Sequence, residues 1–141
     1  MKIVVSPNPY RDKQFKNARQ ACSILREAGA EVALCLPFDV DKTFEIPHDL
    51  RFQDIQKEIK TADMLICFGG DGTILHSSKI ATEHNLPILG VNIGTMGFIA
   101  ELEAGEIELL RKIPKGDYTV EERTMLDVSC LLYTSPSPRD A

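Results

Sequence analysis

Short apolar runs that alternate with stretches of helical periodicity constrain the fold of this chain more than any other feature. The runs cover residues 2–5, 31–36, 64–68 and 86–91, and they are apolar along nearly their whole length. Strands of this kind are buried on both faces, which is typical of parallel sheets. We therefore predict an α/β fold in which helices cover both faces of a doubly wound, mostly parallel sheet.

The stretches between the runs predict the helices. Residues 15–28 carry apolar or small side chains at helical spacing and end before Gly29, a typical C-cap. Further helices are expected over residues 52–60, in the segment after Thr73, and over residues 106–112. All but the last would connect successive apolar runs, as crossover helices do in parallel sheets.

Composition and charge exclude several classes of protein. The chain has 141 residues, of which 43% are hydrophobic and 26% charged, and this suits one ordinary globular domain. Its net charge of -5 gives no basic surface for nucleic acid or an anionic membrane. No segment resembles a signal peptide or a membrane span, so we expect a cytoplasmic protein with neither nucleic-acid nor membrane partners.

The cysteines do not indicate a metal site. Cys22, Cys35, Cys67 and Cys130 lie far apart, without the spacing of zinc ligands or of a disulfide framework. We interpret them as small buried hydrophobic residues.

The motif that indicates chemistry follows the third apolar run. Residues 69–73 read Gly-Gly-Asp-Gly-Thr, and the next helix is expected to take Thr73 as its N-cap. Glycines permit backbone angles closed to other residues and leave room for a nucleotide phosphate to meet main-chain N–H groups. Asp71 suits phosphoryl transfer, where a carboxylate contacts a metal ion or accepts a proton from an attacking hydroxyl. The alternative is that Asp71 is a turn residue, because the motif is not the Walker pattern.

A second glycine cluster follows the fourth apolar run. It contains Asn92, Gly94 and Gly97. Because parallel strands end at one edge of the sheet, the two loops are expected to bracket one crevice near a topological switch point. The alternative is a simple bend in which Asn92 satisfies its own backbone.

Together, the two motifs resemble those of a known family. Residues 69–73 followed by residues 90–98, Gly-Val-Asn-Ile-Gly-Thr-Met-Gly-Phe, are similar to the amino-terminal domain of NAD kinases, which phosphorylate NAD to NADP with ATP or polyphosphate. Diacylglycerol kinases, sphingosine kinases and phosphofructokinases share the first motif, so the second one points to NAD kinase within this wider group. The resemblance extends from residue 1 to about residue 129.

The resemblance implies a role for each motif residue. Asp71 would act as general base on the 2′-hydroxyl of the adenosine ribose, and Gly72 and His76 would line the NAD site. The phosphate-binding loop would be shaped by Gly69, Gly70 and Thr73, and the crevice wall by Asn92, Gly94, Gly97 and Phe98. A divalent cation, normally Mg²⁺, would accompany the phosphate donor, and the full-length enzyme would be a homo-oligomer.

The resemblance also implies a division of the chain. Residues 1–117 correspond to the nucleotide-binding domain, and residues 118–130 to the start of a β-rich domain that is otherwise missing, so we expect little or no activity from this chain. Residues 131–141 contain two Ser-Pro pairs and resemble translated adapter sequence. We expect a non-native or disordered tail there.

Two other functions stay open at this point. A lipid kinase of the diacylglycerol type shares the first motif. A non-catalytic nucleotide-binding module would use the glycine loops to hold phosphate and Asp71 only as a turn residue. An Asp71→Asn variant distinguishes an enzyme, which loses turnover, from a binding module, which loses nothing.

Overall fold

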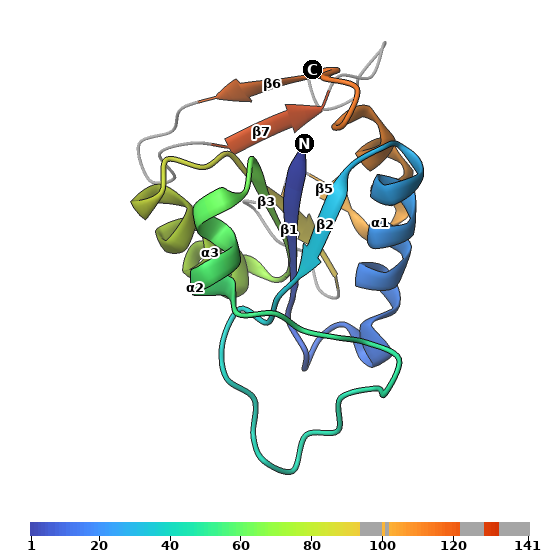
Figure 1. The fold of residues 1–141 in the computed structure, drawn as a ribbon, viewed down its shortest axis with the longest axis vertical. Coiled ribbons are helices and arrows are strands. Elements are labelled where there is room, and N and C mark those ends of the chain that lie inside the picture. The colour runs from blue at the N-terminus through green and yellow to red at the C-terminus, as the bar shows by residue number, and fades with distance from the viewer. Residues whose placement is uncertain (94–99, 101, 122–128, 133–141) are drawn as a thin grey trace.

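The computed structural model describes residues 1–93, 100, 102–121 and 129–132. Its centre is a five-stranded sheet (Figure 1) in which every pair of neighbouring strands is parallel. The strands are β1 (Lys2–Pro7), β2 (Glu31–Leu34), β3 (Met64–Gly69), β4 (Ile88–Asn92) and β5 (Leu102–Glu103). The predicted parallel α/β fold is confirmed.

The order of the strands is β2-β1-β3-β4-β5. The chain moves outward from β1 to β2 in one direction, and from β3 to β4 and β5 in the other. The topological switch point therefore lies between the carboxyl ends of β1 and β3, where ligands of such sheets are bound.

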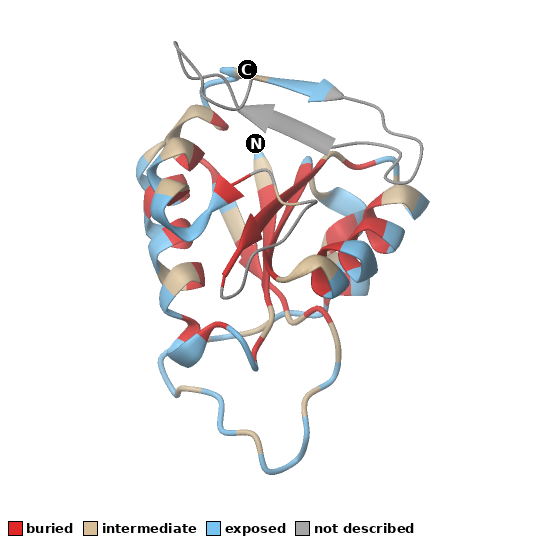
Figure 2. Ribbon diagram, turned by 180° about the vertical axis from the view of Figure 1, so that it is seen from behind, coloured by how far each residue is buried: buried red, intermediate tan, exposed pale blue. Residues whose placement is uncertain are grey.

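Helices cover both faces of the sheet, which makes it doubly wound. On one face lie α1 (Lys16–Glu27) and η3 (Ala104–Lys112), and on the other α2 (Ile55–Glu58), η2 (Ile59–Thr61) and α3 (Asp71–Glu83). Side chains alternate between the faces along a strand. In β1, Ile3 and Val5 belong to the core on the face of α1 and η3, and Val4 belongs to the core on the face of α2 and α3. β1, β3 and β4 are buried along nearly their whole length, and Figure 2 shows the middle of the sheet as mostly buried.

Several predicted boundaries differ from the structure. The helix expected over residues 52–60 consists of the short α2 and η2, because the Asp54 side chain accepts from the N–H of Gln56 and so caps a helix that begins at Ile55. The helix expected over residues 106–112 is the 3₁₀ helix η3, which starts at Ala104 with a capping box between Glu103 and Glu106. The two-residue strand β5 and the 3₁₀ turn η1 (Lys13–Phe15) were not predicted.

The remaining strands form a separate ribbon. β6 (Tyr118–Glu121) and β7 (Ser129–Leu132) pair in antiparallel fashion. Both views place the ribbon at the end of the sheet where the N terminus lies, while the long loop after β2 extends from the opposite end (Figures 1 and 2). Leu131 and Leu132, which the sequence analysis assigned to the tail, pair with Thr119 and Tyr118, and the rest of that tail lies outside the described residues.

No helix in the described ranges combines the length and the apolar character that crossing a bilayer requires.

Candidate functional site

The Gly-Gly-Asp-Gly-Thr segment lies at the carboxyl end of β3, next to the switch point. Gly69 is the last residue of β3, and α3 begins at Asp71. The N-cap of α3 is Gly70, with extended angles of φ −96° and ψ −172°. The prediction that Thr73 is the N-cap is therefore wrong, because the N-cap lies three residues earlier.

Thr73 instead fills the space between two loops. Its side chain is buried, and its Oγ1 accepts a hydrogen bond from Nδ2 of Asn8 at 2.8 Å. Asn8 directly follows β1, and its main-chain N–H donates to the carbonyl of Phe68 at 2.8 Å. Its Oδ1 accepts from the N–H of Tyr10 at 2.9 Å, which fixes the orientation of the amide. Asn8 thus joins the ends of β1 and β3, and no sequence signal singled it out.

The glycines of the motif matter because they lack a side chain, and not because they adopt unusual backbone angles. Among the described glycines, positive φ angles occur only at Gly29 and Gly116, so the expected unusual angles at residues 69, 70 and 72 are absent. A Cβ on Gly69 would lie 2.6 Å from Cβ of Thr73, whereas one on Gly70 or Gly72 would meet nothing within 4 Å. Gly69 therefore lets α3 pack against β3, and Gly70 and Gly72 keep the loop open to a ligand.

Asp71 occupies the first turn of α3 and is partly exposed. A carboxylate in this position is stabilised by the positive end of the helix macrodipole. The same end offers main-chain N–H groups to an anionic ligand. Asp71 is thus accessible beside a site that favours negative charge.

His76 lies one and a half turns further along α3 and turns toward the loop after β2. Its Nε2 donates to the carbonyl of Pro37 at 2.9 Å, and its ring meets that of Phe38 edge-on at 6.3 Å. His76 therefore ties α3 to this loop.

Asn92 ends β4 and pairs in register with Gly69, which brings the second motif beside the first. It is 3% exposed, and its Nδ2 donates to Oε2 of Glu103 at 3.0 Å. Its Oδ1 is buried without a hydrogen-bond partner in the described part of the chain. Glu103 thus orients the amide through a contact that the sequence did not indicate. The other predicted wall residues, Gly94, Gly97 and Phe98, lie outside the described residues.

The described residues fit a magnesium ion carried by a phosphate donor, not one held by the protein alone. Within them, no three His, Cys, Asp or Glu side chains gather into a group that could hold a metal ion. Mg²⁺ bound together with substrate phosphates needs only one or two carboxylates from the protein. Asp71 supplies one carboxylate next to the expected phosphate position.

A groove of about 1220 Å³ runs beside α3 on the side of β2. Its walls come from the loop after β2, from the start of α2 and from α3. The lining includes Phe38, Val40, Ile55, His76, Lys79 and Ile80.

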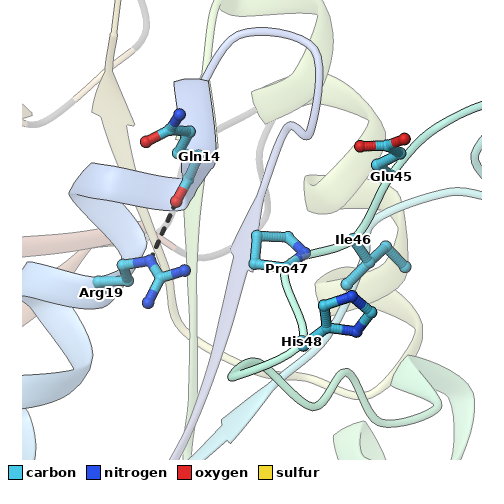
Figure 3. A pocket seen from close by; sticks show the side chains of 6 residues that line it. All are labelled: Gln14, Arg19, Glu45, Ile46, Pro47 and His48. Carbon is cyan, nitrogen blue, oxygen red and sulfur yellow. Dashed lines mark hydrogen bonds between the residues drawn. The ribbon is translucent and has the colours of Figure 1, made fainter.

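A second hollow lies between the start of α1 and the loop after β2, and it includes Arg19 and His48 (Figure 3). Arg19 donates to the carbonyl of Gln14 at 3.0 Å and also forms an ion pair with Asp49. The side-chain hydrogen bonds between Arg19 and Asp49 raise the pKa of Arg19 and lower the pKa of Asp49. The only guanidinium lining this hollow is thus already neutralised by a carboxylate, so we place no ligand there.

The cysteines behave as predicted where the structure describes their side chains. Cys22, Cys35 and Cys67 are buried and free. Burial raises the pKa of both Cys35 and Cys67 to about 12, so neither forms a reactive thiolate near neutral pH. The side chain of Cys130 lies outside the described residues.

Comparison with known proteins gives a consistent result. The family described as the ATP-NAD kinase N-terminal domain matches residues 2–118. The NAD kinase of Bacteroides fragilis is 33% identical over 132 residues, which are 92% of this chain and 46% of that protein. The NAD kinase of Corynebacterium diphtheriae is 30% identical over 132 residues, covering 91% of this chain and 42% of the relative. The NAD kinase of Natranaerobius thermophilus is 46% identical over 79 residues, which are 55% of this chain and 27% of that protein.

The chain spans less than half the length of these curated relatives. Among solved structures, a flavone reductase aligns with 81% of this chain and 50% of its own, at 14% identity and a TM-score of 0.39. That likeness is too weak to bear on function.

Proposed function

Because the chain belongs to the ATP-NAD kinase family, whose N-terminal domain it contains, we propose that it serves to phosphorylate NAD to NADP at the 2′-hydroxyl of the adenosine ribose. The observation that best supports the proposal is the placement of Asp71. This carboxylate lies in the first turn of α3, at the carboxyl end of β3 and beside the switch point of the sheet.

Asp71 would act as the general base. A ribose hydroxyl is a weak nucleophile at neutral pH, and a carboxylate within hydrogen-bond reach removes its proton as the bond to phosphorus forms. The one other carboxylate of α3, that of Glu83, lies at its far end. Asp71 is therefore the carboxylate of α3 that lies at the proposed phosphate site and can act as the general base.

The first turn of α3 would hold the transferred phosphate. Main-chain N–H groups at a helix N-terminus favour anionic ligands and can stabilise the charge that develops on the phosphoryl oxygens. A Cβ on Gly70 or Gly72 would meet no atom within 4 Å, so these glycines leave room for a phosphate. A divalent cation bound to the donor would neutralise further phosphate charge, with Asp71 as its protein ligand or neighbour. Gly69 and Thr73 would keep the loop in place, and His76 and Asn92 would border the NAD site.

Further features of the proposal concern the whole protein. The donor would be ATP or polyphosphate, and the full-length enzyme a cytoplasmic homo-oligomer. The 141 residues span less than half the length of the relatives, so we expect little or no NAD phosphorylation from these residues by themselves.

The test joins the chain to the part of the Bacteroides fragilis NAD kinase that follows the matched region, and measures NADP formation from NAD, ATP and Mg²⁺. We expect turnover, and a loss of at least about a hundredfold in the Asp71→Asn variant, the scale at which a general base contributes. A matched Asp63→Asn variant, changed on the amino side of β3, is expected to retain activity. Turnover that survives Asp71→Asn would refute the assignment of the base, and phosphorylation of a lipid in place of NAD would favour the diacylglycerol-type alternative.

A further inference from the structure

The α3 residues that line the groove start at His76, about one helical turn after Gly72 of the proposed phosphate loop, and the groove walls are partly aromatic. We propose that this groove is the subsite for the purine base of the phosphate donor, which makes the donor a nucleoside triphosphate and not inorganic polyphosphate. This inference rests on the proposed function, because it takes the first turn of α3 as the place of the donor phosphates.

One face of α3 connects the two places. Gly72, His76, Lys79 and Glu83 follow one another at i, i+4, i+7 and i+11, so they share that face. The last three line the groove, and Gly72 lies one turn before His76. Gly72 is exposed, and a Cβ there would meet no atom within 4 Å. A ligand with phosphates at the helix N-terminus can therefore extend along this face into the groove without a steric barrier at Gly72.

The aromatic wall of the groove is held in a fixed orientation. The ring of Phe38 is half-buried and stacks nearly parallel to that of Tyr10, with centroids 6.0 Å apart and an interplanar angle of 9°. On another side it meets the ring of His76 edge-on. The Tyr10 hydroxyl accepts from the N–H of Asp41 at 3.1 Å, which anchors this ring in turn. A supported, accessible aromatic ring is the element on which proteins stack nucleobases.

The charges of the groove favour a base over a chain of phosphates. Asp39, Asp54 and Glu83 line it together with the cation Lys79. This excess of carboxylates repels inorganic polyphosphate. It suits a neutral ring whose exocyclic amino group donates hydrogen bonds, as that of adenine does. The remaining lining is largely apolar, with Val40, Ile55 and Ile80 among its residues.

The test compares three probes on the 141-residue chain by titration calorimetry in the presence of Mg²⁺: ATP, inorganic tripolyphosphate and adenosine. We expect ATP to bind at least about tenfold more tightly than tripolyphosphate. Phe38→Ala should weaken ATP binding by about tenfold, in line with the cost of removing a ring beneath a stacked base. It should leave tripolyphosphate binding unchanged.

Phe44→Ala is the matched control. Phe44 lies in the same loop and also touches Tyr10, edge-on at 5.4 Å, but it does not line the groove.

A second pair of variants does not depend on the loop aromatics. Gln56→Trp places a large ring in the groove from an exposed position on α2, while Gln20→Trp makes the same change at an exposed position on α1. Only Gln56→Trp should lower the affinity for ATP.

The outcomes separate this inference from the proposed function. Equal affinity for ATP and tripolyphosphate overturns the base subsite and leaves the kinase proposal intact. Adenosine binding without tripolyphosphate binding supports the groove and counts against the phosphate loop. An equal effect of Phe38→Ala and Phe44→Ala, or no binding of ATP and adenosine at all, overturns the inference.

Discussion

At the scale of single residues, the two adjacent glycines of the motif have different tasks. A methyl group on Gly69 would overlap with Thr73, whose atoms lie 2.6 to 2.9 Å from the added Cβ, while Gly70 faces open space with extended backbone angles. We expect Gly69→Ala to lower the free energy of unfolding by about 1–3 kcal/mol, the usual cost of overpacking. Gly70→Ala should change it far less. Urea unfolding of the two variants measures the difference, and equal losses would contradict the packing role of Gly69.

Asn8 offers a second prediction at this scale, because it joins the end of β1 to the first turn of α3 through Thr73. Asn8→Ala should speed amide hydrogen exchange at residues 72–74, because the first turn of α3 loses this contact. Thr73→Val should have a similar effect, and combining the two should add little.

Asn17→Ala is the control for Asn8→Ala. Asn17 also donates one side-chain hydrogen bond, from its Nδ2 to Asp12 at 3.0 Å, at the start of α1. An unchanged exchange rate at residues 72–74 in Asn8→Ala, with the protein folded, would refute the role of Asn8.

At the scale of elements, α2 and α3 cover two thiols, that of Cys67 in β3 and that of Cys35, which directly follows β2. Cys35 and Cys67 belong to the core on that face of the sheet, and burial raises the pKa of each to about 12. Because the ordinary value is 9.0, the unfolded thiols lose their protons at lower pH than the folded ones. Stability should therefore fall as pH rises above about 9.

Alkylation by iodoacetamide measures the same protection. The rate for Cys35 and Cys67 in the folded chain should be slow and nearly constant from pH 7 to about 9, because the thiolate is the reactive form. In urea the rate should rise steeply over this interval. Rapid alkylation of the folded protein at pH 8 would show that the helices do not cover these thiols.

Strands that are apolar along their length were predictable from the sequence, whereas the first residues of the helices, which capping sets, were not. β1, β3 and β4 are buried on both faces, so the continuous apolar runs located them well. The starts of α2, α3 and η3 depend on which residue caps each helix, and Asp54, Gly70 and Glu103 do so. In the site, residues with distinctive chemistry such as Asp71 were identifiable. Asn8 and Glu103 were not, because their partners are distant in sequence.

At the scale of the whole molecule, the fold brings both motifs to one edge of the sheet. Strand order places Gly69 between the ends of β1 and β4, so Asn8 and Asn92 flank the glycine loop from either side. The site thus depends on tertiary topology as well as on local sequence. For the same reason we expect a peptide of residues 64–83 alone to bind ATP at least about tenfold more weakly than the chain, and calorimetry measures this. Equal affinity would show that the loop needs no scaffold.

The position of the first residue has a practical consequence. Met1 is 41% exposed and precedes β1 at the end of the sheet opposite the glycine loop. A biotin or fluorescent dye attached to this amino group would point away from Asp71. The chain can therefore be immobilised on a sensor surface through its first residue with the glycine loop facing the solution, so that nucleotides reach it without obstruction.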